Sequence, residues 1–132
     1  MRIFYLLLLF TITSNAQFGK YLTSFNKATN LELTTKIVYG DFEDYGWKSN
    51  AAAIASMSMN IVVVNKQKWS EMSSSSRWAV MYHELAHIIG YRHTDDPDDL
   101  MYYIQRANLT QAEYFKQRNK FLKRLAELKS SR

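Results

Sequence analysis

The sequence contains no cysteine. This absence excludes disulfide bonds, a lipid attached through cysteine, and latency maintained by a cysteine thiolate. A chain of this size without disulfides has to be stabilised by its apolar core or by a bound metal ion. Internal repeats and long linkers are also absent, so the 132 residues are expected to form one domain.

A long apolar run is missing as well. Residues 3–12 are almost continuously apolar, but a membrane-spanning helix needs about 20 such residues. Arg2 precedes this run, and small or polar residues follow it up to Ala16. This order is typical of a secretory signal peptide. We therefore expect a signal peptide over residues 1–16, cleaved near Ala16, and a folded domain over residues 17–132. The product would be secreted or periplasmic, without a stable membrane anchor.

Charge is unevenly distributed along the chain. The formal net charge is +5, and the excess of Lys and Arg lies after residue 115. No motif of interleaved basic and aromatic residues accompanies it, so we expect no nucleic-acid partner. We interpret the basic residues as a solvated helix face. Binding of anionic polymers by this face is an alternative, which predicts strong salt dependence and indifference to a chelator.

Three segments are predicted to be strands. Residues 31–39 are rich in β-branched residues and partly alternate, and residues 61–64 form a compact β-branched run typical of a buried strand. Residues 52–59 are small and apolar and form a third candidate, followed by a weak break at Asn60. Residues 40–50 are predicted to be a loop, because they are rich in Gly, Asp and Asn.

Helices are predicted around the strands. A short helix is expected around residues 21–28, and a second over residues 77–89, after N-cap candidates at 73–76. Apolar residues of the second helix recur at helical spacing: Trp78, Met81, Tyr82, Leu85, Ile88 and Ile89. Thr110 and Glu113 form a capping box that opens a last helix, ending near residue 128. Its predicted apolar face consists of Tyr114, Phe115, Phe121, Leu122, Leu125 and Leu128.

The second helix carries the pattern His-Glu-x-x-His at residues 83–87. Two residues four apart on a helix lie on one face, about 6 Å apart along the axis. His83 and His87 can therefore bind one metal ion, with Glu84 placed to touch a water on the metal rather than the metal itself.

A third ligand follows a turn. Gly90 can adopt a positive φ at low cost, which ends the helix, and His93 follows three residues later. Three protein ligands leave the fourth zinc position open for water, as in catalytic rather than structural sites. Glu84 would act as the general base toward that water. The chain has only these three histidines.

Residues 83–93 resemble the extended zinc signature of the metzincins, a clan of zinc metalloproteases. The stretch from His93 to Tyr102, with its Asp-Pro segment and Leu-Met-Tyr ending, resembles the matrixin branch. The resemblance implies that Met101 forms the methionine turn beneath the metal. It also implies that Tyr102 and Tyr103 line the pocket beyond the scissile bond, although packing in the lower part of the domain is an equal alternative.

The resemblance is specific over residues 77–103 and extends over 61–128. Matrixin catalytic domains are longer and carry structural zinc and calcium sites, so it implies a reduced metzincin. The expected fold is α+β: a small mixed sheet, an active-site helix, a methionine turn and a C-terminal helix. In the family an edge strand pairs with the substrate backbone, and residues 52–58 are the candidate here.

The resulting prediction is a secreted, monomeric zinc endopeptidase that acts on protein or peptide substrates. A non-catalytic, zinc-stabilised secreted binding module is the main alternative, although a metal used only to stabilise the fold would gain nothing from Glu84. Calcium binding by the acidic residues at 95, 96, 98 and 99 is a further alternative, but their spacing matches no EF-hand loop.

Overall fold

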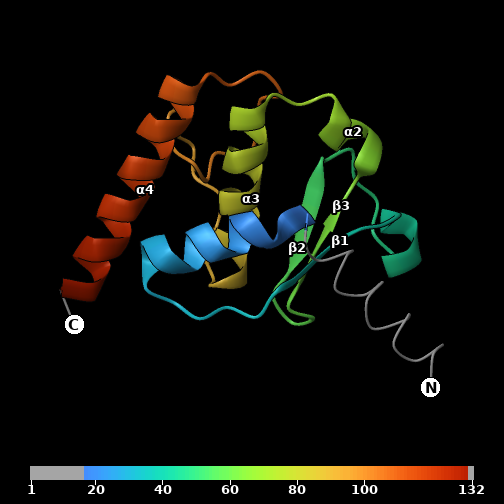
Figure 1. The fold of residues 1–132 in the computed structure, drawn as a ribbon, viewed down its shortest axis with the longest axis horizontal. Helices are drawn as coiled ribbons and strands as arrows, with labels where there is room; N and C mark the ends of the chain where they lie inside the picture. Colours follow the sequence, from blue (N-terminus) through green and yellow to red (C-terminus); the bar gives the residue numbers. More distant parts are fainter. Residues whose placement is uncertain (1–16, 131–132) are drawn as a thin grey trace.

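A three-stranded sheet and a central helix form the framework of the molecule (Figure 1). The computed structural model describes residues 17–130, so the expected signal peptide over 1–16 lies outside the described residues. The mixed α+β architecture agrees with the predicted fold class. Within the described part of the chain, no helix has the length and apolar character needed to cross a membrane.

The sheet is small and mixed, as predicted. Its strands are β1 (Lys36–Tyr39), β2 (Ala53–Ser56) and β3 (Ile61–Val64), in the order β1-β3-β2. β1 runs parallel to β3, whereas β2 is antiparallel to it. All four residues of β3 are buried, which agrees with their continuous β-branched pattern. β2 therefore lies at an edge of this sheet.

Two predicted strands are shorter in the structure. Residues 31–35 lie outside the sheet, because the side chain of Asn26 binds both main-chain groups of Leu33 at 3.0 Å. The prediction of a strand over 52–59 was too long, because residues 57–60 form the turn between β2 and β3. Asn60 ends this turn with a φ of 52°, which Asn tolerates better than most residues.

The helices are more numerous than predicted. Residues 17–29 are helical, a longer stretch than expected, because Phe18, Tyr21 and Phe25 recur at helical spacing and are all buried. Two short helices were missed: η1 (Phe42–Tyr45) and α2 (Lys66–Ser70). Both follow an N-cap side chain, that of Asp41 and that of Asn65 respectively.

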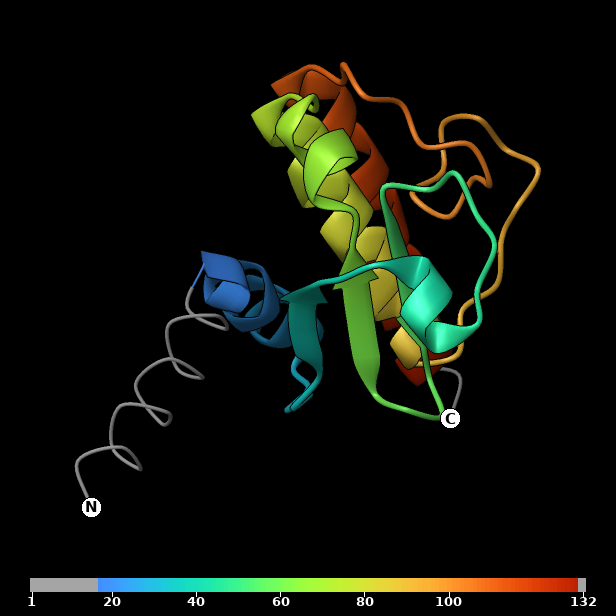
Figure 2. The ribbon, with the colours of Figure 1, turned by 90° about the vertical axis from the view of Figure 1, so that its right-hand side faces the viewer.

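Helix α3 (Ser74–Ile88) is the central element. It begins three residues earlier than predicted, because Ser73 is the N-cap and its hydroxyl accepts from the N–H of Ser76 at 3.1 Å. The sheet lies on one side of α3 and helix α4 (Gln111–Ser130) on the other (Figure 2). Consequently residues 79–86 are all buried.

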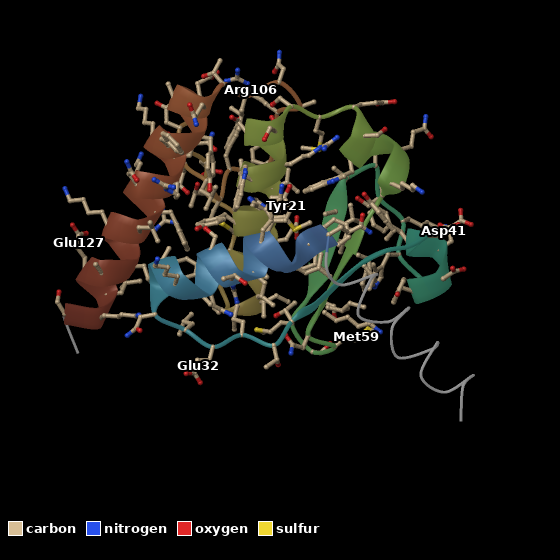
Figure 3. The ribbon with its side chains drawn as sticks, in the orientation of Figure 1. Tyr21, Glu32, Asp41, Met59, Arg106 and Glu127 are labelled. Carbon is tan, nitrogen blue, oxygen red and sulfur yellow. The ribbon has the colours of Figure 1, made fainter. Side chains whose placement is uncertain are left out.

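Helix α4 opens with the predicted capping box. The N–H of Thr110 donates to the Glu113 carboxylate at 3.1 Å, and the N–H of Glu113 donates to the Thr110 hydroxyl at 3.2 Å. The predicted apolar face was too wide, since Phe115 and Leu128 are exposed. Tyr114 and Phe121 alone are buried in α4, whereas charged side chains such as Glu127 project outward (Figure 3).

Candidate metal centre

The helix α3 places His83 and His87 one turn apart on the side that faces a cleft. His83 is only 2% exposed, whereas His87 is partly exposed. Their imidazole Nε2 atoms lie 3.1 Å apart. The spacing of four residues therefore produces the convergence that the sequence predicted.

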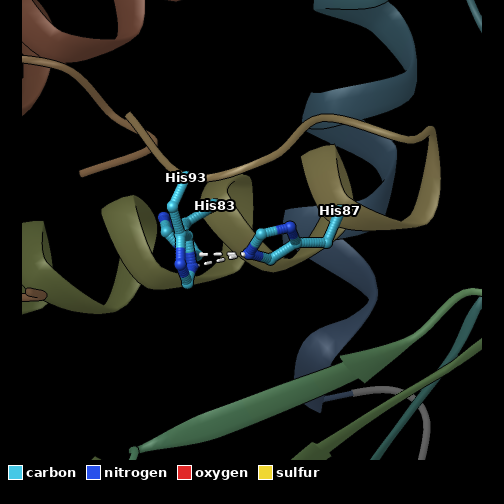
Figure 4. Close-up of side chains that lie close together, drawn as sticks. All are labelled: His83, His87 and His93. Atoms are coloured by element: carbon cyan, nitrogen blue, oxygen red, sulfur yellow. Dashed lines mark hydrogen bonds between the residues drawn. The ribbon is translucent and has the colours of Figure 1, made fainter. Parts of the chain in front are cut away.

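His93 is brought to the same point by the turn that ends α3. The N–H of Gly90 donates to the carbonyl of His87, and the N–H of Tyr91 donates to the carbonyl of Ala86, both at 3.0 Å. This pair of bonds is a Schellman motif, with Gly90 at a φ of 99°. The turn reverses the chain, so that His93 returns toward the helix (Figure 4).

The three imidazoles form one cluster. The Nε2 atom of His93 lies 3.3 Å from that of His83 and 3.0 Å from that of His87. A tetrahedral zinc ion bound by nitrogens at about 2.0–2.1 Å would hold its ligand atoms about 3.3–3.4 Å apart. Among residues 17–130 these three side chains form the one group of three or more that could hold a metal ion.

Hydrogen bonds at the other ring nitrogens determine which nitrogen is free to bind metal. The Nδ1 atom of His83 lies 2.8 Å from the carbonyl of Leu100, and that of His87 lies 2.7 Å from the carbonyl of Tyr91. Because a carbonyl oxygen only accepts, each Nδ1 carries the proton and donates it. The Nε2 atoms are then unprotonated and cannot bond to each other. A cation between them satisfies both, so the residues fit a metal ion.

Burial supports the same protonation state. Burial lowers the pKa of His83 to about 4, although the hydrogen bond with the Leu100 carbonyl raises this pKa by a smaller amount. Burial also lowers the pKa of His87. Both rings are therefore neutral at neutral pH, which is the form that binds a metal ion.

Glu84 occupies the same cleft and is 7% exposed. Burial raises the pKa of its carboxyl to about 8, and a main-chain hydrogen bond from Ala55 opposes this effect. Ala55 belongs to the edge strand β2. Glu84 is thus held between the metal-site helix and the sheet edge.

Met101 lies in a turn against α3 and is fully buried. Its carbonyl accepts from the N–H of Thr94 at 2.9 Å, which ties the turn to the residue after His93. The preceding residue, Leu100, supplies the carbonyl that orients His83. The turn therefore supports two of the three histidines.

The cleft has a volume of about 820 Å³, within the usual range of ligand sites. Tyr103 lines it, whereas Tyr102 is absent from the lining and contacts Tyr103 with ring centroids 4.7 Å apart. The residues of β2 and the chain just before it form another wall, and all three histidines line the cleft.

Gln105 is a site residue that the sequence did not reveal. Its amide nitrogen donates to the carbonyl of Tyr102 at 2.7 Å and lies 3.0 Å from the Nδ1 of His83. A second, longer contact of 3.5 Å reaches the carbonyl of Leu100. No motif marks this role, because Gln105 acts on main-chain carbonyls rather than on the metal.

The acidic segment that was considered for calcium contacts helix α4 instead. Asp96 forms an ion pair with Lys120, and Asp99 forms one with Arg124. Asp98 lies 3.9 Å from Lys116. Several basic residues interpreted as a solvated face are therefore partners of this loop.

A known protein family matches this chain over most of its length. The family described as "Putative phage metallopeptidase" matches residues 15–121, which is most of the chain. The crystal structure of the metallopeptidase zymogen of Pyrococcus abyssi abylysin is similar at 13% identity and a TM-score of 0.48, covering 86% of this chain and 95% of that one. No curated protein matches the sequence. The extent of the family match shows that this chain belongs to the family described as putative phage metallopeptidase.

Proposed function

We propose that the chain is a secreted zinc endopeptidase of the metzincin type, reduced in size and most similar in its motif to the matrixins. The observation that carries the proposal is the convergence of three imidazoles on one point. The Nδ1 atoms of His83 and His87 each donate to a main-chain carbonyl, which leaves their Nε2 atoms free to bind a metal ion.

His83, His87 and His93 would hold the zinc ion. When bound there, zinc supplies a Lewis acid that polarises the peptide carbonyl and lowers the pKa of water. Three protein ligands leave a position open toward the cleft, which favours a catalytic over a purely structural role.

Glu84 is the proposed general base, since a zinc ion bound beside it would favour the ionised form of the carboxyl group that burial disfavours. Its carboxylate accepts a proton from the water that attacks the peptide carbonyl carbon, and passes that proton to the amine nitrogen as the C–N bond breaks. The hydrogen bond from Ala55 holds the carboxylate beside strand β2. Glu84 therefore lies next to β2, the edge along which we propose that the substrate backbone lies.

The shape of the site suits a peptide. β2 is an edge strand that lines the cleft, and its side chains there are small or apolar. An extended peptide could form main-chain hydrogen bonds with such an edge, independently of its sequence. Export by a cleaved signal peptide is a separate part of the proposal, which N-terminal sequencing of the exported protein would test.

The decisive experiment is cleavage of a diverse peptide mixture, read by mass spectrometry. The native protein with zinc is compared with a chelated sample, with Glu84→Gln and with Glu71→Gln, which alters an exposed carboxylate at the same cleft. We expect the chelated protein to be inactive and Glu84→Gln to bind zinc but lose activity by at least about 100-fold. The Glu71→Gln variant should stay active.

Two results would contradict the proposal. Cleavage that persists in Glu84→Gln would remove Glu84 from the mechanism. An absence of cleavage with one zinc ion bound per chain would favour the non-catalytic, zinc-stabilised binding module.

A further inference from the structure

Arg124 lies on helix α4, which packs against α3, and its side chain reaches the loop that carries Asp99. Its guanidinium forms a two-pronged ion pair with Asp99: Nη1 pairs with Oδ2, and Nη2 lies 3.4 Å from Oδ1. The Asp99 side chain is almost fully buried. A buried carboxylate of this kind needs its cation, because an unpaired charge there is costly.

Asp99 in turn fixes the methionine turn. Its Oδ1 atom accepts from the N–H of Met101 at 2.8 Å, and its carbonyl accepts from the N–H of Tyr102 at 3.1 Å. Leu100 lies between these bonds. Its carbonyl is the one that accepts from the Nδ1 of His83.

The same guanidinium also contacts the second supporting residue. Its Cζ atom lies 5.7 Å from the ring centroid of Tyr91, and the Tyr91 ring packs edge-on against Phe121 of α4. The carbonyl of Tyr91 accepts from the Nδ1 of His87. Arg124 therefore contacts Tyr91, which orients one ligand, and Asp99, which holds the turn that orients another.

We propose that Arg124 is a positioning residue for the metal centre. It holds Tyr91 and the 99–101 turn in the places where their carbonyls keep the Nε2 atoms of His83 and His87 directed at the metal. The inference rests on the metal-binding part of the proposed function and is independent of peptide cleavage. Arg124 lies beyond residues 15–121, the part of the chain that the family match covers.

Neighbouring ion pairs provide a contrast. Lys120 pairs with Asp96 from the same helix to the same loop, but both side chains are more than 40% exposed. The Asp96 carboxylate accepts from the N–H of Asp98, and the Asp96 carbonyl accepts from the N–H of Asp99 at 3.0 Å, whereas the Asp99 carboxylate itself accepts from the N–H of Met101 in the turn. The Lys120→Met variant therefore tests whether any contact between α4 and the loop suffices, or only the contact made by Arg124.

The experiment measures zinc affinity by competition with a chromogenic chelator, together with the visible absorption spectrum of the cobalt-loaded protein. Arg124→Met is compared with the native protein, Arg124→Lys and Lys120→Met. We expect about a 10-fold weaker zinc affinity and an altered cobalt spectrum in Arg124→Met, as for other residues that orient metal ligands. The zinc affinity of Arg124→Lys should lie between those of Arg124→Met and the native protein, because a lysine keeps the charge but not the two-pronged geometry.

A double variant keeps the proposal testable if Arg124→Met folds poorly. In Arg124→Met/Asp99→Asn no buried carboxylate is left unpaired, and the fold should be largely retained. We expect it to bind zinc more weakly than the native protein and about as tightly as Asp99→Asn alone, because both residues act through one contact. A folded double variant with native zinc affinity and an unchanged cobalt spectrum would overturn the positioning role.

The outcomes separate the two proposals. If the native protein binds no zinc, the proposed function fails, and this inference fails with it. If the native protein binds zinc and Arg124→Met binds it equally well with an unchanged cobalt spectrum, only the positioning role of Arg124 is overturned. An equal loss of affinity in Lys120→Met would also overturn it.

Discussion

The N–H of Tyr91 donates to the carbonyl of Ala86 at 3.0 Å, which closes a turn that contains Gly90 at a φ of 99°. This closure links the last ligand on α3 to the loop that carries His93. An L-residue at such a φ is strained by about 1–2 kcal/mol. A Cβ at Gly90 would meet no atom within 4 Å, so backbone strain alone sets the cost of a side chain.

Gly90→Ala is therefore expected to lower the free energy of unfolding by about 1–2 kcal/mol and to weaken zinc binding. Gly46→Ala is a matched control, since Gly46 has a φ of 75°, equally open space and a position away from the histidines. Urea unfolding should give similar losses of stability for both. Zinc titration should distinguish them, and equal zinc affinity in both variants would mean that the turn does not set the position of His93.

Removal of one histidine should affect metal binding and stability together. Because a bound ligand stabilises the folded state by about 2.7 kcal/mol at 100 times its dissociation constant, zinc should raise the melting temperature of the native protein. In His93→Ala this rise should largely disappear, and the zinc content after dialysis should fall.

Arg92→Ala is the control for this prediction, because Arg92 is an exposed neighbour in the same loop. It should respond to zinc and to a chelator like the native protein. An unchanged zinc content and melting temperature in His93→Ala would exclude His93 from the metal centre.

The convergence of His83 and His87 could be predicted from the sequence, because helix geometry fixes the distance between residues four apart. Gly90 gave the turn that places the third histidine, and the structure has that turn. The carbonyls of Leu100 and Tyr91 were not readable, since every residue has a carbonyl and only the fold selects which ones face an imidazole. The contact of Arg124 with Asp99 could not be predicted for a similar reason, because the two residues are 25 positions apart in the sequence.

The errors in the fold have local causes. The first half of the strand predicted over 31–39 is not in the sheet, because the Asn26 side chain forms hydrogen bonds with both main-chain groups of Leu33. A pattern of β-branched residues does not indicate such a competing side-chain hydrogen bond. Helices η1 and α2 have only four and five residues. Their one sequence signal was a capping Asp or Asn, which is equally common in turns.

Ser76 joins the start of α3 to the start of α4, and its replacement should destabilise the fold. Its buried hydroxyl accepts from the N–H of Leu109 at 2.8 Å. Ser76→Ala leaves this buried N–H without its partner, which costs about 1–3 kcal/mol. Chemical denaturation should show that loss, whereas Ser74→Ala, at an exposed position two residues earlier, should change stability little. Equal stability of the two variants would contradict the role given to Ser76.

Gln105 offers the sharpest test of how the turn around Met101 orients His83. Its amide nitrogen donates to the carbonyl of Tyr102. The same nitrogen lies close to the Nδ1 atom of His83, which also faces the carbonyl of Leu100. Gln105→Leu keeps similar bulk but removes the donor, so the turn should become less ordered. We expect zinc affinity to fall by at least several-fold, toward the 10-fold lower end seen for residues that support metal ligands.

Arg106→Ala serves as the control beside it. Among the described residues, Arg106 forms an exposed ion pair with Glu113 and no hydrogen bond with the carbonyls of the turn. Such an exposed ion pair contributes little to stability, so the zinc affinity of Arg106→Ala should match that of the native protein. A competition titration measures both variants under one set of conditions. If Gln105→Leu binds zinc as tightly as Arg106→Ala, the carbonyls of the turn are held without Gln105, and the order of His83 then depends on Asp99 and Leu100 alone.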